Sequence, residues 1–244
     1  MGRYCRQDKE AGLTKLILAL NVGTKDNALE WLERVGNQVD LFKLQMDLFG
    51  RVGPELVRHF VQHGASVFLD LKFCDIPSVV GKAVEAVAEL GVSMLTVHTI
   101  GGQKMLEAAA AASKSGTKKP LILGVTVLTS ISNDELAQLT GAHYSVKERV
   151  LSLARLAQDS GCDGVVASPE EVSLIKQACG KGFLVVTPGI RLKPSSDDQS
   201  RYATPGQAAS SGADYIVVGR PIYQAQDPIA VIKEIKAQIE GSNG

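Results

Sequence analysis

Three charged residues lie close together in the segment Ser66–Val79, which reads SVFLDLKFCDIPSV. Its first half, Val67–Lys72, is rich in β-branched and aromatic residues, which is typical of a buried strand. Asp70 and Lys72 are two apart, so they project from the same face of that strand, and Asp75 follows its end. Charges on a buried strand must be paired or change their pKa. The segment therefore predicts an acid, a base and a second acid in an active site, with a purely structural Asp–Lys pair as the alternative.

Lys43 is a further candidate because of the strand in which it lies. In the run VDLFKLQ, period-two alternation places Val39, Leu41 and Lys43 on one face. The lysine either points inward among apolar neighbours or caps the strand in water. The inward orientation requires a partner, and Asp70 on the adjacent strand is well placed to be one.

More polar residues fall at or just past the ends of other predicted strands: Asn21, His98, Thr129, Ser130, Arg191, Gly219 and Arg220. Gly219 allows close backbone approach, Arg220 is a cation, and the proline after it suits the start of a short helix. Arg191 adds a second positive charge. Together they predict a phosphate site. His98 is interpreted either as a residue lining the site or as a core histidine with satisfied hydrogen bonds.

Strand-like runs alternate with helical patterns along nearly the whole chain. The predicted strands cover residues 16–20, 39–44, 66–72, 94–98, 121–128, 164–167, 183–187 and 215–218. The predicted helices cover a segment capped by Thr24, and residues 54–63, 77–90, 105–112, 133–139, 146–160, 169–178 and 228–239. The longest irregular stretch, 190–205, is unusual for an ordinary connection and predicts a mobile active-site loop, with a solvated surface loop as the alternative.

Eight strand–helix repeats predict an α/β fold, a single (β/α)8 TIM barrel over residues 1–244, with 1–14 as a short N-terminal extension. A doubly wound open sheet is the alternative. Active sites of such barrels lie at the carboxyl ends of the strands, where phosphate is often held after strands 7 and 8. This is the edge where the polar residues gather.

Composition narrows the classes of function. The 26 basic residues equal the 26 acidic ones, which argues against a general nucleic-acid or membrane partner. No stretch approaches the length of an apolar membrane span, and the charged N-terminus has no signal-peptide pattern. Four dispersed cysteines without CxxC spacing are typical of reduced thiols. We therefore expect a cytoplasmic protein.

The motifs resemble those of the orotidine 5′-phosphate decarboxylase family from about Leu16 to Ile239. The DxKxxD signature of that family matches Asp70–Asp75, and an Ile-Pro pair follows it here as in the family. The other matches are the strand-2 lysine at Lys43, VTxLTS at Val125–Ser130, TPGIR at Thr187–Arg191, the phosphate-loop glutamine at Gln199 and VGRxI at Val218–Ile222. Several separated motifs in the right order make the resemblance specific.

The resemblance implies decarboxylation of orotidine 5′-phosphate to UMP, the last step of UMP synthesis, without metal or other cofactor. Loss of CO₂ leaves a vinyl carbanion at C6 of the pyrimidine. Lys72 would stabilise and protonate that carbon, and Asp70 would oppose the substrate carboxylate and hold Lys72 charged. Lys43 and Asp75 would complete the catalytic charge array.

The resemblance also implies the substrate-binding residues and the assembly. The implied substrate-binding residues are Asn21, Ile76, Thr129, Ser130, Pro188, Arg191, Gln199, Gly219 and Arg220. Arg191, Gln199, Gly219 and Arg220 among them would hold the phosphate, and binding there would close the loop over the site. In the family, the second aspartate of DxKxxD reaches the neighbouring active site. A homodimer that shares Asp75 across its interface is therefore implied.

Two positions depart from the family pattern. Asn21 stands where the family usually has aspartate, and Val79 stands where it usually has threonine. Both positions are associated with ribose hydroxyls in the family. Asn21 keeps a hydrogen-bonding side chain without the charge, whereas Val79 cannot replace a hydroxyl. We expect weaker ribose binding or local compensation, with the chemistry of the DxKxxD residues intact.

Two other functions remain as alternatives. A magnesium-dependent enzyme like 3-keto-gulonate 6-phosphate decarboxylase shares DxKxxD, but Lys43 would repel a cation where such enzymes carry an acidic ligand. A catalytically silent nucleotide-phosphate binder would explain Asn21 as early decay. The retained Lys43, Asp70, Lys72 and Asp75 argue against that second alternative.

Overall fold

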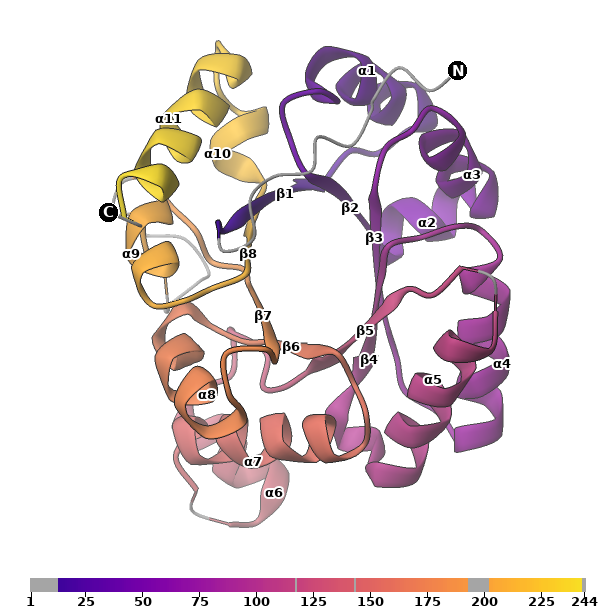
Figure 1. The fold of residues 1–244 in the computed structure, drawn as a ribbon, viewed down its shortest axis with the longest axis vertical. Helices are drawn as coiled ribbons and strands as arrows, with labels where there is room; N and C mark the ends of the chain where they lie inside the picture. Colours follow the sequence, from indigo (N-terminus) through magenta and orange to yellow (C-terminus); the bar gives the residue numbers. More distant parts are fainter. Residues whose placement is uncertain (1–12, 117, 143, 193–201, 243–244) are drawn as a thin grey trace.

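A computed structural model describes residues 13–242 except Thr117, His143 and residues 193–201. Within this part of the chain, eight parallel strands close into a barrel in sequence order (Figure 1). They are β1 (Lys15–Leu20), β2 (Leu41–Gln45), β3 (Val67–Phe73), β4 (Met94–His98), β5 (Leu121–Val125), β6 (Gly164–Val166), β7 (Leu184–Thr187) and β8 (Tyr215–Val218). The predicted (β/α)8 TIM barrel is confirmed, and the open-sheet alternative is wrong because β8 pairs with β1.

Helices surround the barrel on its outer side (Figure 1). They are α1 (Lys25–Val35), α2 (Met46–Val52), α3 (Pro54–Gln62), α4 (Pro77–Ala88), α5 (Gln103–Ser115), α6 (Asn133–Thr140), α7 (Val146–Asp159), α8 (Val172–Cys179), α9 (Pro205–Ser210), α10 (Arg220–Tyr223) and α11 (Pro228–Glu240), with short 3₁₀ turns at Thr99–Gly101 and Pro169–Glu171. None of the helices in the described ranges is long and apolar enough to cross a bilayer.

A layer of apolar side chains fills the middle of the barrel interior, with Ala19, Leu121, Val166 and Tyr215 packed against it. That layer consists of Ile17, Leu41, Phe68, Met94, Leu123, Val186 and Val217, all of them buried. Side chains on the alternate positions, such as Leu16, Leu18 and Phe42, pack outward against the helices. Because side chains alternate along a strand, the residues two positions after the inner layer also face inward, one level closer to the carboxyl edge. Lys43, Asp70 and Thr96 are such residues, each two positions after a member of the inner layer.

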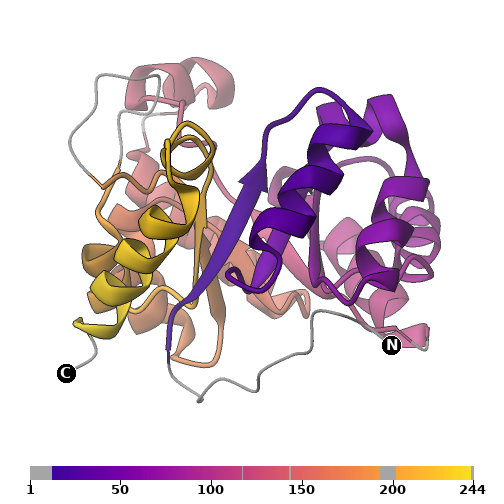
Figure 2. The ribbon, with the colours of Figure 1, turned by 90° about the horizontal axis from the view of Figure 1, so that it is seen from above.

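The carboxyl edge lies at the top in Figure 2, toward which the indigo arrow of β1 points. At the opposite edge, three aspartates directly precede β2, β6 and β8. Each accepts a hydrogen bond from a backbone N–H of the preceding strand: Asp40 from Leu16 (2.8 Å), Asp163 from Ile122 (2.8 Å) and Asp214 from Val185 (2.6 Å). Carboxylates at this lower end of the barrel therefore join neighbouring strands.

Most predicted elements agree with the structure to within a few residues. The helices α2 and α9 are additional, and β5 ends at Val125 rather than at residue 128. The ends of the 190–205 segment are held together, since Arg191 N donates to Ala203 O (3.0 Å) and Ala203 N to Gly189 O (3.1 Å). The mobility predicted for that loop concerns residues that mostly lie outside the described ranges. In the predicted extension, Thr14 Oγ1 donates to Ala213 O (2.7 Å).

Candidate active site

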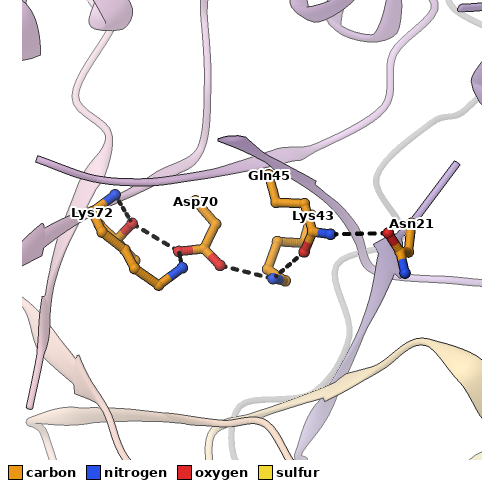
Figure 3. Close-up of polar contacts among 6 residues, drawn as sticks. Asn21, Lys43, Gln45, Asp70 and Lys72 are labelled. Atoms are coloured by element: carbon orange, nitrogen blue, oxygen red, sulfur yellow. Dashed lines mark hydrogen bonds and ion pairs between the residues drawn. The ribbon is translucent and has the colours of Figure 1, made fainter. Parts of the chain in front are cut away.

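The centre of the site is a buried carboxylate held between two ammonium groups (Figure 3). Lys43 Nζ lies 2.7 Å from Asp70 Oδ2, and Lys72 Nζ lies 2.8 Å from Asp70 Oδ1. The Asp70 side chain is 8% exposed, whereas the lysine side chains are 13% (Lys43) and 28% (Lys72) exposed. The inward orientation of Lys43 toward Asp70, one of the two possibilities from sequence, is present. The arrangement places one negative charge at the barrel mouth between two positive charges.

Asp70 is ionised because its partners outweigh its burial. Burial alone would raise the pKa of this carboxyl group, but the charges of Lys43 and Lys72 and their hydrogen bonds lower it from 3.8 to about 2. At neutral pH the centre therefore contains an ionised carboxylate paired with two lysines. At the end of β4, burial and then the charge of Lys72 lower the pKa of the His98 imidazole.

The backbone at Lys72 departs from a regular strand. Its φ is +51°, in the left-handed region that a residue with a Cβ adopts at an energetic cost. The register between β3 and β4 shifts here, because Leu69 pairs with Leu95 but Phe73 pairs with Val97. An advance of four residues along β3 therefore corresponds to an advance of two residues along β4, as in a β-bulge. The sequence predicted that Asp70 and Lys72 share a face, but it did not predict this distortion.

Thr96 of β4 supports the bulge from the barrel interior. Its Oγ1 accepts a hydrogen bond from Lys72 N (2.9 Å) and donates one to Asp70 Oδ1 (2.9 Å). The side chain is fully buried. Sequence reasoning missed this residue, although its position two after Met94 and two before His98 places it on the inner face.

Polar contacts continue from Lys43 toward β1 (Figure 3). Lys43 Nζ donates to Gln45 Oε1 (3.1 Å), and Gln45 Nε2 donates to Asn21 Oδ1 (3.4 Å). Asn21 Nδ2 in turn donates to the Tyr223 hydroxyl of α10 (3.4 Å). Gln45 and Tyr223 were missed from sequence, although alternation with Lys43 could have identified Gln45. These contacts connect the charged centre to the end of β8, where the phosphate site is predicted.

Asp75 lies apart from the charged centre of its own chain. It is exposed, and its Oδ1 accepts a hydrogen bond from Ile76 N (2.6 Å). Within the described residues it makes no hydrogen bond or ion pair with Lys43 or Lys72. Ile76 and Val79 beside it are also exposed, at 63% and 46%. The predicted array of two cations and two anions is therefore present in one chain only as Lys43, Asp70 and Lys72.

The remaining predicted site residues follow β5, β7 and β8 at the carboxyl edge. Half-buried Thr129 and exposed Ser130 lie in a turn after β5. Half-buried Pro188 and Arg191 follow β7, Gly219 precedes α10, and Arg220 is the first residue of α10. Gln199 lies outside the described residues. His98 Nδ1 is buried without a hydrogen-bond partner in the described part of the chain, which disagrees with a satisfied core histidine.

The described residues contain no group of three or more His, Cys, Asp or Glu side chains placed to hold a metal ion. The chemistry that the geometry itself supports is electrostatic. A second anion placed directly against the Asp70 carboxylate is repelled by that carboxylate, and the adjacent Lys72 ammonium stabilises negative charge that develops beside it.

Comparison with known proteins identifies the family. The model of the orotidine 5′-phosphate decarboxylase / HUMPS family matches residues 14–235. The chain belongs to this family. An orotidine 5′-phosphate decarboxylase of Legionella pneumophila (strain Corby) is 48% identical over 223 residues, which cover 91% of this chain and 97% of that protein. One from Syntrophotalea carbinolica is 46% identical over 238 residues, covering 93% and 96% of the two chains.

The same family is found among solved structures. The crystal structure of orotidine 5′-phosphate decarboxylase from Lactobacillus acidophilus superposes with a TM-score of 0.84 at 38% identity, covering 93% of this chain and 99% of that one. The membership of this decarboxylase family that the sequence motifs predicted is confirmed. The family match extends from Thr14 to Ile235 and therefore includes all eight strands of the barrel.

Proposed function

We propose that this protein decarboxylates orotidine 5′-phosphate to UMP in pyrimidine synthesis, without a metal or another cofactor. The observation that carries the proposal is the Asp70 carboxylate fixed between Lys43 and Lys72 at the mouth of a barrel of this family. The chemistry breaks the bond between C6 of the pyrimidine and its carboxyl carbon. CO₂ leaves, the electron pair remains on C6, and a proton then completes UMP.

Lys72 is the residue that acts on C6. As an ammonium it stabilises the electron pair left on the carbon and then transfers a proton from Nζ to it. Asp70, 2.8 Å from that Nζ, forms an ion pair with this ammonium. The contact also fixes the direction in which the ammonium points.

Asp70 also acts on the leaving carboxylate. A substrate carboxylate placed beside this buried anion is repelled, and the repulsion disappears as neutral CO₂ forms. The pKa of about 2 keeps Asp70 negative, so it does not relieve the repulsion by taking up a proton near neutral pH. Lys43 holds the other oxygen of Asp70 and limits its movement away from the substrate.

The rest of the substrate is held by residues that follow β1, β3, β5, β7 and β8. We assign the phosphate to Arg191, Gln199, Gly219 and Arg220, and the pyrimidine and loop contacts to Thr129, Ser130, Ile76 and Pro188. Asn21, whose side chain contacts Gln45, is assigned to the ribose. Binding energy from the phosphate then holds the reacting carbon against Lys72.

The second anion of the array comes from another copy of the chain in this proposal. Asp75 is exposed and has no contact with the charged centre of its own chain within the described residues. The exposed Ile76 and Val79 beside it form an apolar surface that a second copy can cover. A homodimer in which Asp75 enters the neighbouring site is consistent with both observations.

Formation of UMP from orotidine 5′-phosphate tests the function. We expect turnover by the wild type after treatment with a chelator, and a loss of about 10³-fold or more in kcat/KM for Lys72→Ala. The exposed Lys233 on α11 provides a matched control, and Lys233→Ala should behave like the wild type. Equal rates for Lys72→Ala and the wild type would remove Lys72 from catalysis. Loss of activity on chelation would favour the magnesium-dependent alternative, and absence of UMP formation would favour the silent binder.

A further inference from the structure

Thr96 contacts both halves of the Asp70–Lys72 pair through a single oxygen atom. Its Oγ1 accepts from the backbone N–H of Lys72 and donates to Asp70 Oδ1, each at 2.9 Å. Figure 3 labels Asp70 and Lys72, the two residues that these contacts join. The residue is fully buried on β4, whereas Asp70 and Lys72 lie on β3, so the two contacts join neighbouring strands.

The contact with Lys72 N lies where the regular ladder between β3 and β4 is interrupted. The register shifts between Leu69 and Phe73, and Lys72 has a φ of +51°. A lysine remains in this left-handed conformation only where the surrounding structure holds it there. The Thr96 hydroxyl accepts a hydrogen bond from the Lys72 amide at the place where the strand ladder is interrupted.

The contact with Asp70 completes the surroundings of its carboxylate. Oδ2 is held by Lys43 Nζ, and Oδ1 by Lys72 Nζ together with the Thr96 hydroxyl. Because the hydroxyl proton is directed at Asp70, the lone pairs of Oγ1 are available to the Lys72 amide. One hydroxyl thus sets both the rotation of the carboxylate and the backbone from which the Lys72 ammonium extends.

We propose that Thr96 is a positioning residue of the decarboxylation, which holds Lys72 in its left-handed conformation and Asp70 in its orientation toward the Lys72 ammonium. The proposal rests on the proposed function, because it concerns the decarboxylation step. It assigns Thr96 no contact with the substrate. Its effect is exerted on the chemical step through Asp70 and Lys72. Binding of the nucleotide phosphate at the other side of the barrel mouth does not depend on it.

Two variants separate the hydroxyl from the shape of the side chain. Thr96→Val keeps the branched shape and removes the hydroxyl, whereas Thr96→Ser keeps the hydroxyl and removes the methyl group. We expect kcat to fall about 10- to 100-fold in Thr96→Val and to stay within about threefold of the wild type in Thr96→Ser. The dissociation constant for UMP should change less than about threefold in both variants.

A crystal structure of Thr96→Val is the second readout, and φ of Lys72 should leave the left-handed region or the Lys72–Asp70 contact should lengthen. Should Thr96→Val not fold, Thr96→Ala against Thr96→Ser makes the same comparison, because both lack the methyl group and only one keeps the hydroxyl. Equal kcat in the variants with and without the hydroxyl would overturn the proposal. So would a loss of kcat matched by an equal loss of UMP affinity.

Measuring Lys72→Ala in the same assay distinguishes failure of the role of Thr96 from failure of the proposed function. If Lys72→Ala abolishes turnover and Thr96→Val does not reduce it, the function stands and the role of Thr96 is wrong. If Lys72→Ala retains wild-type turnover, the proposed function itself fails.

Discussion

Asp70 illustrates how a buried charge is kept ionised at the level of single residues. Its side chain is 8% exposed, and an unpaired carboxylate at such a site would take up a proton. Contacts of 2.7 and 2.8 Å with two lysines and one of 2.9 Å with Thr96 prevent this. The same contacts fix the carboxylate in the position from which it is proposed to act on a bound anion.

The lowered pKa of Asp70 predicts how stability depends on pH. The pKa is about 2 in the folded protein, below the ordinary value of 3.8, so the unfolded chain takes up the proton first. The stability that Asp70 contributes is therefore complete above about pH 5 and is lost as the pH falls through 4 toward 2. In urea unfolding, the difference in unfolding free energy between the wild type and Asp70→Asn should be about 1 kcal/mol smaller at about pH 3 than at about pH 7.

The exposed Glu89 at the end of α4 controls for general effects of acid. The difference between the wild type and Glu89→Gln should vary much less over the same pH range. A difference for Asp70→Asn that is constant between about pH 3 and pH 7, or that grows toward acid, would show that the carboxylate is not stabilised by its lysines.

Asn21 and Val79, the two positions that depart from the family pattern, predict how tightly the ribose of the nucleotide is bound. Asn21 Oδ1 is engaged by Gln45, and Val79 has no hydroxyl, so neither position provides the anionic or hydroxyl partner usual in the family. We expect the double variant Asn21→Asp, Val79→Thr to bind UMP about tenfold more tightly than the wild type, as measured by calorimetric titration. Gln62→Glu, at an exposed site on α3, makes a comparable amide-to-acid change as the control. Equal affinity of the double variant and the wild type would refute the expectation.

At the level of elements, charged residues at the amino edge of the barrel contribute to stability, whereas those at the carboxyl edge form the candidate active site. Aspartates before β2, β6 and β8 bind backbone amides of the neighbouring strands at the amino edge, while the charged centre occupies the carboxyl edge. Asp214 also forms an ion pair with Lys176 Nζ at 2.6 Å, and that lysine donates to Lys181 O and Phe183 O as well. The pair therefore joins α8 to the strands β7 and β8.

Replacing Asp214 should weaken the fold without altering catalysis. Asp214→Ala removes the acceptor for Val185 N and leaves Lys176, whose side chain is 12% exposed, without its carboxylate. We expect a loss of about 3 kcal/mol in unfolding free energy, against about 1 kcal/mol for Asp163→Ala, which removes only the bond from Ile122 N. Chemical denaturation measures both values, and kcat should be unchanged in both. Equal destabilisation by the two substitutions would show that the Lys176 pair adds nothing.

The elements also show which local signals can be recognised in the sequence. Thr24 was predicted to cap α1, and its Oγ1 accepts from Asn27 N (3.2 Å). The helix α2 was missed because it spans only seven residues, contains Gly50 and begins without a side-chain cap. The bulge in β3 was missed because Lys72 is not a residue type that signals a positive φ. Only the pairing with β4 imposes that conformation.

At the level of the whole molecule, one chain contains an incomplete version of the predicted charge array. Lys43, Asp70 and Lys72 meet in the barrel mouth, but Asp75 is exposed beside the exposed side chains of Ile76 and Val79. The proposed homodimer resolves this difference by placing Asp75 in the site of the partner. It also covers apolar surface that would otherwise face water.

Hybrid dimers test the shared site directly. When Lys72→Ala and Asp75→Ala proteins are mixed and allowed to exchange subunits, half of the dimers are hybrids, and one site in each hybrid has both residues intact. We expect recovery of about a quarter of the wild-type rate of UMP formation. A mixture in which no activity returns, although subunit exchange is demonstrated, would place Asp75 outside the neighbouring site.

The matched control for this experiment uses two residues of the same chain. Asp70 and Lys72 are in direct contact within one subunit, so a hybrid of Asp70→Ala and Lys72→Ala has no intact site. That mixture should stay inactive. Recovery there would mean that the two proteins exchange more than subunits, or that the contact is not required.

The sequence by itself determined the barrel, the inward direction of its alternate side chains and the identity of the charged residues at one edge. These features follow from periodicity and residue type, which are local properties of the chain. Only the tertiary structure decided that Lys72 has a left-handed backbone, that Thr96 joins it to Asp70, and that Asp75 lies outside the centre of its own chain. These features depend on register and contact between segments distant in sequence, which no local pattern encodes.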